Sequence, residues 1–463
     1  MEAVSRSVEL YAASLLATAK LPDARLATRA VKFVAALAAH PGGSIAEACE
    51  DRHQAKAAYR FIENERVRVE NVLPSLADAS ARNCAGHARI LVIQDTTAFN
   101  FSALKATTGL GPIGDAGSSA QGIWCHTTLA ATESGKPIGL LHQELWVRDP
   151  EQRHKAQQRR RLPIEQKESM RWLTGIRMAH GRVAECLGDK RPALIHIEDR
   201  EADITEVFED VRRLRDEAII RCRHNRVTAH PLKRAFAAVR AAPCLGTRSV
   251  NVPRHAGHPA RKARVELRAC RLSLPAQTAD EPPLELTLLE VWEPQPPADC
   301  EPLHWLLWTT FEAQTPEQAV QVVTWYTCRW RIEDVHLTLK SGYNVEELQF
   351  ETAERLEKLI TLITPLAIRI VNLRDAAREQ PEASCTEVLS DPEWRTLQAY
   401  CNKQLPGPQE APPTLRQAAL WIGRLGGHMG RKGDGLPGVR TLWIGFRDLQ
   451  RMTRLFQICR SFG

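Results

Sequence analysis

Two short runs of aliphatic and β-branched residues, each followed by an aspartate, constrain the fold of this chain most. The first run, ILVIQD, spans residues 90–95, and the second, ALIHIED, spans residues 193–199. Between them, GIWCHTTLAAT and PIGLLHQELWV flank the short turn ESGK, which is typical of a β-hairpin. The order strand, hairpin, helix, strand, helix predicts a mixed α/β fold whose sheet presents carboxylates where strands end.

The pattern along the 463 residues divides the chain into three units. Residues 1–70 have helical periodicity, and residues 376–463 have it again around two linkers rich in Pro and polar residues. Residues 71–375 hold the α/β pattern, interrupted at about 222–312 by short alternating runs that predict a β-rich insertion. We therefore expect an α/β core with a β-rich insertion, flanked by two α-helical domains.

The net charge of +7 is spread unevenly over the chain. Residues 221–271 hold thirteen Lys and Arg against one acid, Glu266, so the rest of the chain is net acidic. A local basic patch of this size points to a polyanion such as DNA, and a solvated, charged linker is the alternative. The same two interpretations apply to a basic side of the N-terminal helices, which is formed by Arg25, Arg29, Lys32, Arg52, Lys56 and Arg60.

Cysteine usage and hydropathy exclude several classes of protein. The twelve cysteines include no C-x-x-C pair and no close Cys/His cluster, which argues against a zinc ribbon or a secreted disulfide framework. No apolar run approaches the roughly 18 residues of a membrane span. The first twenty residues favour an amphipathic helix over a signal peptide. We expect a cytoplasmic protein with reduced thiols and no membrane partner.

The segment YTCRWRIEDVHLTLK, residues 326–340, carries charges where a core helix would carry leucines. At about 100° per residue, Tyr326, Arg329, Glu333 and Lys340 fall within an arc of roughly 60° on one helix face. One interpretation is a solvated face on which Arg329 and Glu333 form a surface pair. The other is a carboxylate set among groups that contact something negatively charged.

Asp95, Asp199 and Glu333 are the candidate catalytic residues. A fold that brings two strand ends and a crossing helix together would gather three carboxylates, which cannot all stay ionised cheaply without a cation. Oxygen ligands without Cys or His favour Mg²⁺ or Mn²⁺, and a pair of such ions can act on both oxygens of a phosphodiester. The alternatives are an Asx-turn for Asp95 and a helix N-cap for Asp199. Glu201 and Asp203 are interpreted as simple first-turn acids.

Trp305 and Arg221 are candidate contacts to nucleic acid. Trp305 lies in LHWLLWTTF, shortly before the charged helix, and a tryptophan beside arginines can stack on an unstacked base. A core position is the alternative for this tryptophan. Arg221, with Arg223 and Arg226, comes directly off an apolar strand, which suits phosphate contact or an exposed surface.

Taken together, these motifs resemble the DDE transposases of bacterial insertion sequences, in the branch of the IS-four family that carries a Y-R-E-K pattern. The resemblance covers nearly the whole chain in order, through AYRFI, GLLHQELW, YTCRWRIED and GRLGG. Its core motifs are QDTT at Asp95, DREAD at Asp199 and the spacing of Tyr326, Arg329, Glu333 and Lys340.

The resemblance implies an RNase H-like core in which Asp95, Asp199 and Glu333 hold two Mg²⁺ ions, with Mn²⁺ as a substitute. It also implies cut-and-paste transposition of double-stranded DNA. In that reaction water cleaves one strand at the transposon end, and the freed 3′ hydroxyl attacks the opposite strand to form a hairpin. The hairpin is then opened, and the 3′ ends join target DNA.

Further residue roles follow from the resemblance alone. Tyr326, Arg329 and Lys340 would hold DNA phosphates, Trp305 would stack on a flipped base, and Arg221 would support the same DNA end. Residues 1–70 would bind the transposon ends, and residues 376–463 would dimerise when the protein is on DNA. Arg29 and Arg60 stand at positions that match end-binding residues.

The expected setting is the bacterial cytoplasm, in association with the nucleoid. Two other functions remain as alternatives. One is an RNase H-like nuclease that cleaves without joining, and the other is a transposase-derived DNA-binding protein without strand transfer.

Overall fold

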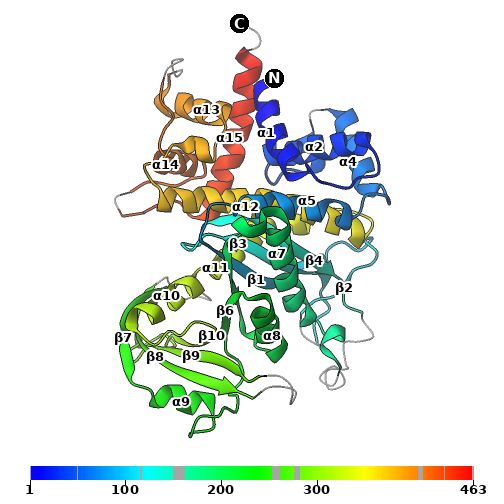
Figure 1. Ribbon diagram of the computed structural model, residues 1–463. Coiled ribbons are helices and arrows are strands. Elements are labelled where there is room, and N and C mark those ends of the chain that lie inside the picture. Colours follow the sequence, from blue (N-terminus) through cyan, green and yellow to red (C-terminus); the bar gives the residue numbers. More distant parts are fainter. Residues whose placement is uncertain are drawn as a thin grey trace.

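The computed structural model describes residues 2–49, 51–114, 117–149, 162–252, 261–275, 282–404, 410–431 and 433–460. Within these ranges the chain forms a ten-stranded mixed sheet with helices on both faces and helical regions at its two ends (Figure 1). The mixed α/β fold predicted from the sequence is confirmed, and the architecture is consistent with an RNase H-like core.

The strands are β1 (Arg89–Asn100), β2 (Gly111–Pro112), β3 (Gln121–Ala131), β4 (Pro137–Trp146), β5 (Ala193–Glu198), β6 (Glu217–Arg221), β7 (Cys244–Val252), β8 (Arg261–Leu274), β9 (Leu284–Trp292) and β10 (His304–Thr309). The N-terminal helices are α1 (Glu2–Leu15), α2 (Ala24–Ala39), α3 (Ile45–Ala48), α4 (Arg52–Glu63) and α5 (Val69–Arg82). The helices around the sheet are α7 (Met170–Leu187), α8 (Thr205–Leu214), α9 (Ala235–Ala241), α10 (Pro316–Thr327), α11 (Trp330–Leu337) and α12 (Ala353–Glu379). The C-terminal helices are α13 (Asp391–Asn402), α14 (Leu415–Leu425) and α15 (Val439–Arg460). Short 3₁₀ turns are η2 (Ile164–Gln166), η3 (Gly188–Lys190), η4 (Arg200–Ala202), η6 (Val345–Glu347) and η7 (Cys385–Glu387), and η5 (Thr338–Gly342) is a π-helical turn.

β1 occupies the centre of the sheet, whose order is β2-β3-β1-β5-β6-β10-β9-β8-β7, with β4 paired to β3. It runs antiparallel to β3 and parallel to β5. Leu91 and Ile93 belong to the apolar cluster that contains α11 and α12, whereas Ile90 and Val92 belong to the cluster that contains α7. Burial on both faces explains why this run is apolar throughout and does not alternate with polar residues.

The β-rich segment continues the same sheet. β10 runs antiparallel to β6 and to β9, and β8 and β7 follow outward, each antiparallel to its neighbour. Apolar residues of α9 and α10 join different clusters, so the two helices cover opposite faces of this part of the sheet. The strands predicted within the insertion at about 222–312 are thus present as β7 to β10, and the same segment also contains the helix α9.

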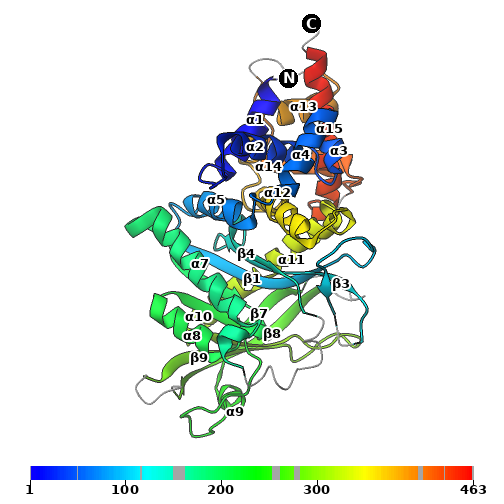
Figure 2. The ribbon, with the colours of Figure 1, turned by 90° about the vertical axis from the view of Figure 1, so that its right-hand side faces the viewer.

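α12 lies between the helical ends of the chain and the sheet (Figures 1 and 2). Lys358 Nζ, which is almost fully buried, donates to the carbonyl oxygens of Ile62 and Asn64 at the end of α4, at 3.3 and 3.2 Å. Farther along the helix, Thr364 Oγ1 accepts a 3.0 Å hydrogen bond from Gln143 Nε2 of β4. One helix therefore contacts both the N-terminal helices and the sheet.

The single helix expected for residues 326–340 is wrong in one respect, because the segment is divided. Its first residues belong to α10, which Thr315 caps by accepting the N–H of Gln318. The last turn of α10 then tightens, since Cys328 N–H bonds to the carbonyl of Trp325, three residues back. α11 and the π-helical turn η5 follow. A uniform polar stripe is therefore not formed: the Tyr326 side chain is buried, whereas that of Glu333 is about half exposed.

Candidate active site

Asp95 lies within β1, where the sequence predicted a strand end. β1 continues to Asn100 because it pairs with β3 over its whole length, with Asp95 opposite Thr127. Its parallel pairing with β5, however, stops at Ile93. Asp95 is consequently placed just past the end of β5. Its Oδ1 accepts the N–H of Thr96 at 2.9 Å, but no turn follows, so the Asx-turn alternative is wrong.

Asp199 comes directly after β5 and lies where the parallel neighbour of β1 ends. Its Oδ1 accepts the N–H of Glu201 at 2.7 Å, so it is the N-cap of the 3₁₀ turn η4. The capping alternative predicted for this residue thus holds for the 3₁₀ turn but not for the helix α8, which begins at Thr205 after Ile204. Two adjacent parallel strands thus present Asp95 and Asp199 at the same region of the sheet, as open α/β sheets do with their functional groups.

Arg329 joins Glu333 of α11 to Asp95 of the sheet. Its Nη2 lies 2.6 Å from Glu333 Oε1, which confirms the predicted Arg329–Glu333 pair, and its Nη1 lies 3.7 Å from Asp95 Oδ2. Burial raises the pKa of Asp95 to about 7, against the lowering influence of Arg329, and the charges of Asp199 and Glu333 add to the rise. Asp199 and Glu333 therefore lie close enough to Asp95 for their charges to affect its pKa.

The guanidinium of Arg329 is the cation between two of these carboxylates in this conformation. Over the described ranges, no group of three or more His, Cys, Asp or Glu side chains is arranged so that it could hold a metal ion. The chemistry of the donors nevertheless suits a hard divalent cation, because all are carboxylate oxygens and burial disfavours the charged form of Asp95. Ligation by Glu333 would require its carboxylate to exchange Arg329 for the metal.

An aromatic cluster with a buried arginine lies beside Arg329. Trp305 of β10 is 4% exposed, and its ring packs edge-on against Tyr326 and Trp330, with ring centroids 5.2 and 5.7 Å apart. The guanidinium of Arg221 lies 5.9 Å from the Trp305 ring and donates to the carbonyl of His304 at 2.9 Å. Burial lowers the pKa of Arg221, and Tyr326 opposes this through its charge and a hydrogen bond. Trp305 is thus buried, as the alternative of a core position requires. Its proposed stacking on an unpaired base stays a prediction.

Lys340 lies on the π-helical turn η5, a kind of irregularity that is frequent at functional sites. Its Nζ is 5.8 Å from the ring centroid of Phe99, four residues beyond Asp95 on β1. Burial, with a smaller effect of the Lys340 charge, lowers the pKa of His336 to about 3. Lys340 is therefore a cation near the strand that carries Asp95.

Asp203 has a role that the sequence interpretation missed, because it is not a simple first-turn acid. It is 1% exposed, its Oδ2 accepts the N–H groups of Arg223 and His224 at 2.7 and 2.9 Å, and its Oδ1 pairs with Arg226 Nη2 at 2.6 Å. This carboxylate holds the segment after β6 against the turn that contains Asp199. A buried acid matched by an arginine about twenty residues away could have been suspected, but not assigned, from the sequence.

A buried polar network on the opposite face of the sheet was also missed. Gln94 Nε2 donates to Glu198 Oε1 at 2.6 Å, and Gln94 Oε1 accepts from His126 Nε2 at 3.0 Å. Thr96 Oγ1 then lies 2.8 Å from His126 Nδ1. Burial raises the pKa of Glu198 well above its ordinary value and lowers that of His126 to about 3, so it disfavours the charged form of both groups. The network joins the residues next to Asp95 and Asp199 across β1 and β5.

Arg29 and Arg60 lie in the N-terminal helical region, on α2 and α4, and α12 lies between these helices and the sheet (Figure 1). Asp23 and Asp51 cap the two helices by accepting backbone N–H groups at 2.9 and 2.8 Å. Arg29 lines a cavity of about 930 Å³ with Arg25, and Arg60 is exposed. The two arginines belong to a surface separate from the three carboxylates.

The positive charge of residues 221–271, the basic window, is partly neutralised by acidic side chains. Arg226, Arg240 and Arg261 pair with Asp203, Glu290 and Glu293, all of which lie outside the window in sequence. Exposed positive charge of the window is found on β7 and β8, at Arg248, Lys262 and Arg264. The positive potential of this region is consequently lower than the sequence count suggests.

Comparison with known protein families gives two matches. Residues 9–67 match the transposase DNA-binding family, and residues 365–463 match the Tn5 transposase dimerisation domain. The first range contains Arg29 and Arg60, and the second begins within α12. No helix in the part of the chain that the structure describes has the length and hydropathy needed to span a membrane. The matches at opposite ends of the chain support a transposase similar to that of Tn5, one that binds DNA and forms dimers.

Proposed function

We propose that this protein is a cut-and-paste DNA transposase of the Y-R-E-K branch, with Asp95, Asp199 and Glu333 as its catalytic carboxylates. It binds the inverted-repeat ends of its own element and hydrolyses one strand at each end. Water attacks the phosphorus, the P–O3′ bond breaks, and a 3′ hydroxyl and a 5′ phosphate result. The 3′ hydroxyl then attacks a phosphorus of the opposite strand, which forms a hairpin and releases the flanking DNA with a 3′ hydroxyl. Water opens the hairpin by breaking the new P–O3′ bond. The regenerated 3′ hydroxyl attacks a phosphorus of target DNA, where a 3′ hydroxyl of the target strand is the leaving group.

The observation that carries the proposal is that carboxylates from distant parts of the chain affect Asp95. Asp95 lies on β1 just past the end of its parallel pairing with β5, Asp199 follows β5, and Arg329 joins Glu333 to Asp95, at 2.6 Å from Glu333 Oε1 and 3.7 Å from Asp95 Oδ2. Burial and the charges of the two other carboxylates raise the pKa of Asp95 to about 7. A carboxyl group whose pKa is perturbed by burial and by nearby charges is typical of functional sites.

Mg²⁺, with Mn²⁺ as a substitute, is the cofactor that these donors favour. Two such ions bound by Asp95, Asp199 and Glu333 would supply an activated attacking oxygen and stabilise the leaving oxygen of the phosphodiester. The side chains around them bind and orient the DNA. Arg329, once released from Glu333, is free to contact a phosphate, and it is buried enough for that contact to be strong.

The aromatic cluster supports a role in holding an unpaired nucleotide. Displacing Trp330 or Tyr326 from the Trp305 ring would open one face of that ring next to the guanidinium of Arg221. Stacking on an aromatic ring offsets part of the few kcal/mol needed to unstack a base. Lys340 and Arg329 would then contact the phosphates on either side.

The proposal is tested with purified protein, Mg²⁺ and duplex DNA that carries the inverted repeats flanking the gene. We expect cleavage at the repeat ends, a hairpin product, and joined products when target DNA is added. Nicked DNA without joined products would instead indicate a nuclease. Binding that needs no metal, with no cleavage under any divalent ion, would indicate a DNA-binding protein and would contradict the proposed chemistry.

A further inference from the structure

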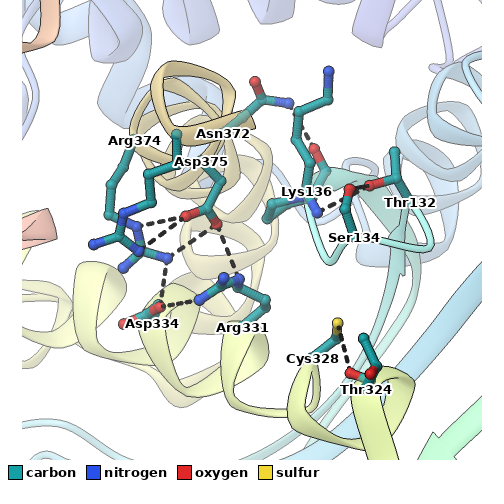
Figure 3. A network of polar contacts seen from close by, with 12 residues as sticks. Thr132, Ser134, Lys136, Thr324, Cys328, Arg331, Asp334, Asn372, Arg374 and Asp375 are labelled. Carbon is teal, nitrogen blue, oxygen red and sulfur yellow. Dashed lines mark hydrogen bonds and ion pairs between the residues drawn. The ribbon is translucent and has the colours of Figure 1, made fainter. Parts of the chain in front are cut away.

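We infer that four charged residues of α11 and α12, Arg331, Asp334, Arg374 and Asp375, form an ion network that positions Glu333 for catalysis. We call these residues the α11–α12 network (Figure 3). The inference rests on the proposed function, since it takes Glu333 as a catalytic carboxylate. It assigns part of the active-site geometry to residues inside the range that matches the dimerisation domain.

The contacts of the α11–α12 network form a closed ring. Arg374 Nη2 lies 2.6 Å from Asp334 Oδ2, and Arg374 Nε lies 2.7 Å from Asp375 Oδ1. Arg331 completes the ring, with its Nε 3.2 Å from Asp375 Oδ2 and its Nη1 3.8 Å from Asp334 Oδ2. Figure 3 shows the four side chains converging between the two helices. Outside the ring, Arg378 Nη1 lies 3.5 Å from Asp375 Oδ1, so three arginines surround the two carboxylates.

Burial makes it costly to break the ion pairs of the α11–α12 network, so their geometry is fixed. The side chains of Asp375 and Arg374 are 2% and 6% exposed, and those of Arg331 and Asp334 are each 27% exposed. Removing one member of a buried ion pair leaves the other charge uncompensated, which is much more costly than the loss of a surface pair. A rotation of α11 that separated Asp334 from Arg374 would carry the same cost.

α11 needs such an external constraint because it is short. Its eight residues lie between the tightened turn at Cys328 and the π-helical turn η5, and a helix of this length has little stability of its own. Ile332 and Val335 anchor it to the apolar core. Glu333 and Asp334 are neighbours on the helix, so fixing Asp334 against α12 fixes the rotation of α11 and with it the direction of the Cα–Cβ bond of Glu333.

The turn between β3 and β4 connects the α11–α12 network to the sheet. Gly135 has φ +92°, and a Cβ there would lie 2.9 Å from Cys328 Sγ and 3.5 Å from Arg331 Nε, so the turn packs closely against the start of α11. Asn372 Nδ2 of α12 donates to the carbonyl of Pro137 at 2.6 Å, just after the turn. β3 pairs with β1 at Asp95. The helix with Glu333 and the strand with Asp95 therefore share one anchor.

The experiment compares Arg374→Gln with Arg369→Gln in the full-length protein. Arg369 is a matched control: it lies on the same helix and pairs with the fully buried Glu393 at 3.2 Å, but that partner is on α13. Hydrogen–deuterium exchange is measured on peptides covering residues 330–340 and 391–402. We expect Arg374→Gln to speed exchange in the first peptide at least about tenfold and Arg369→Gln to affect only the second.

Activity provides the second readout. Arg374→Gln should lower single-turnover cleavage by about ten- to a hundredfold and raise the Mn²⁺ concentration for half-maximal cleavage, because Glu333 is misplaced while end binding persists. Asp334→Asn, a milder change at a half-buried position, should shift both readouts the same way. The double variant should be no worse than Arg374→Gln alone, because both changes break the same contact.

Unchanged exchange of residues 330–340 in Arg374→Gln, or equal acceleration in Arg369→Gln, would overturn the inference. A wild-type Mn²⁺ dependence in both network variants would overturn it as well. If the wild-type protein failed to cleave DNA at all, the proposed function would be contradicted. The hydrogen–deuterium exchange measurement would still decide whether the α11–α12 network orders α11.

Discussion

At the scale of single residues, ionisation of the buried Asp95 carboxyl lowers the stability of the folded protein. Its carboxyl is largely buried, and Arg329 at 3.7 Å compensates only in part, so its pKa is raised from 3.8 to about 7. Between these two pH values the folded chain binds more protons than the unfolded chain. Its free energy of unfolding therefore falls as the pH rises through this window.

Asp95→Asn should accordingly stabilise the metal-free protein above neutral pH. The asparagine is uncharged at every pH, so the gain over wild type should be close to zero near pH 4 and reach a few degrees in melting temperature at about pH 8. Thermal denaturation with a chelator present, at the two pH values, measures this. An equal difference in melting temperature between variant and wild type at the two pH values would show that the fold does not disfavour ionisation of Asp95.

Glu198 provides a second test at this scale. Burial raises the pKa of this carboxyl and so favours its uncharged form, and its Oε1 accepts from Gln94 Nε2, so Glu198→Gln should keep cleavage within about threefold of wild type. Glu198→Ala removes the hydrogen bond between β1 and β5 and should destabilise the protein by about 1–3 kcal/mol. Denaturant unfolding and single-turnover cleavage distinguish the two variants. A severe loss of cleavage activity in Glu198→Gln would mean that Glu198 acts in its charged form.

At the scale of elements, the sequence predicted the strands better than their ends. The apolar runs before Asp95 and Asp199 identified β1 and β5 because both faces of these strands are buried. The extension of β1 to Asn100 could not be predicted, since it depends on pairing with β3. The division between α10 and α11 was missed for a similar reason, because local residues such as Cys328 carry no helix-breaking signal.

The close approach of α7 to the sheet gives a prediction with an internal control. A Cβ at Gly175 would lie 1.8 Å from Gln94 Oε1 and 2.7 Å from Thr128 Oγ1, so Gly175→Ala must displace the polar network. We expect a loss of about 2–4 kcal/mol. Gly181 lies on the same helix with nothing within 4 Å of an added Cβ, and Gly181→Ala should be neutral or stabilise by up to about 1 kcal/mol. Similar effects of both changes on chemical denaturation would contradict this packing.

Of the candidate site, the sequence identified the three carboxylates and the Arg329–Glu333 pair through motif spacing. It could not identify Asp203 or the α11–α12 network. Their partners are about twenty and forty residues away, and their residue types are as common on solvated surfaces. Burial, which only the tertiary structure provides, separates these acids from ordinary surface charges.

At the scale of the whole molecule, α12 relates the three functional regions. It caps the end of α4 through Lys358, contacts β4 through Thr364 and joins α11 through Arg374. The range matching the dimerisation domain starts within this helix. A dimer formed through the C-terminal region would therefore be connected to the carboxylates and to the N-terminal helices by one continuous helix.

Binding of the transposon ends and cleavage of DNA should nevertheless be separable by mutation. Arg60→Ala and Arg29→Ala should each weaken binding to the transposon ends and reduce the slope of log affinity against log salt by about one. Lys190→Ala, at an exposed position on η3, serves as the control and should leave both unchanged. Fluorescence anisotropy over a salt series measures this. Unaltered slopes in both arginine variants would remove these residues from the DNA interface.

The central claim is that Asp95, Asp199 and Glu333 form one catalytic centre. Single-turnover cleavage of prebound end DNA in Mg²⁺ by Asp95→Ala, Asp199→Ala and Glu333→Ala tests it most directly. We predict that each variant binds the DNA but cuts at least about a thousandfold more slowly than wild type. Cutting at the wild-type rate by Glu333→Ala would contradict the account.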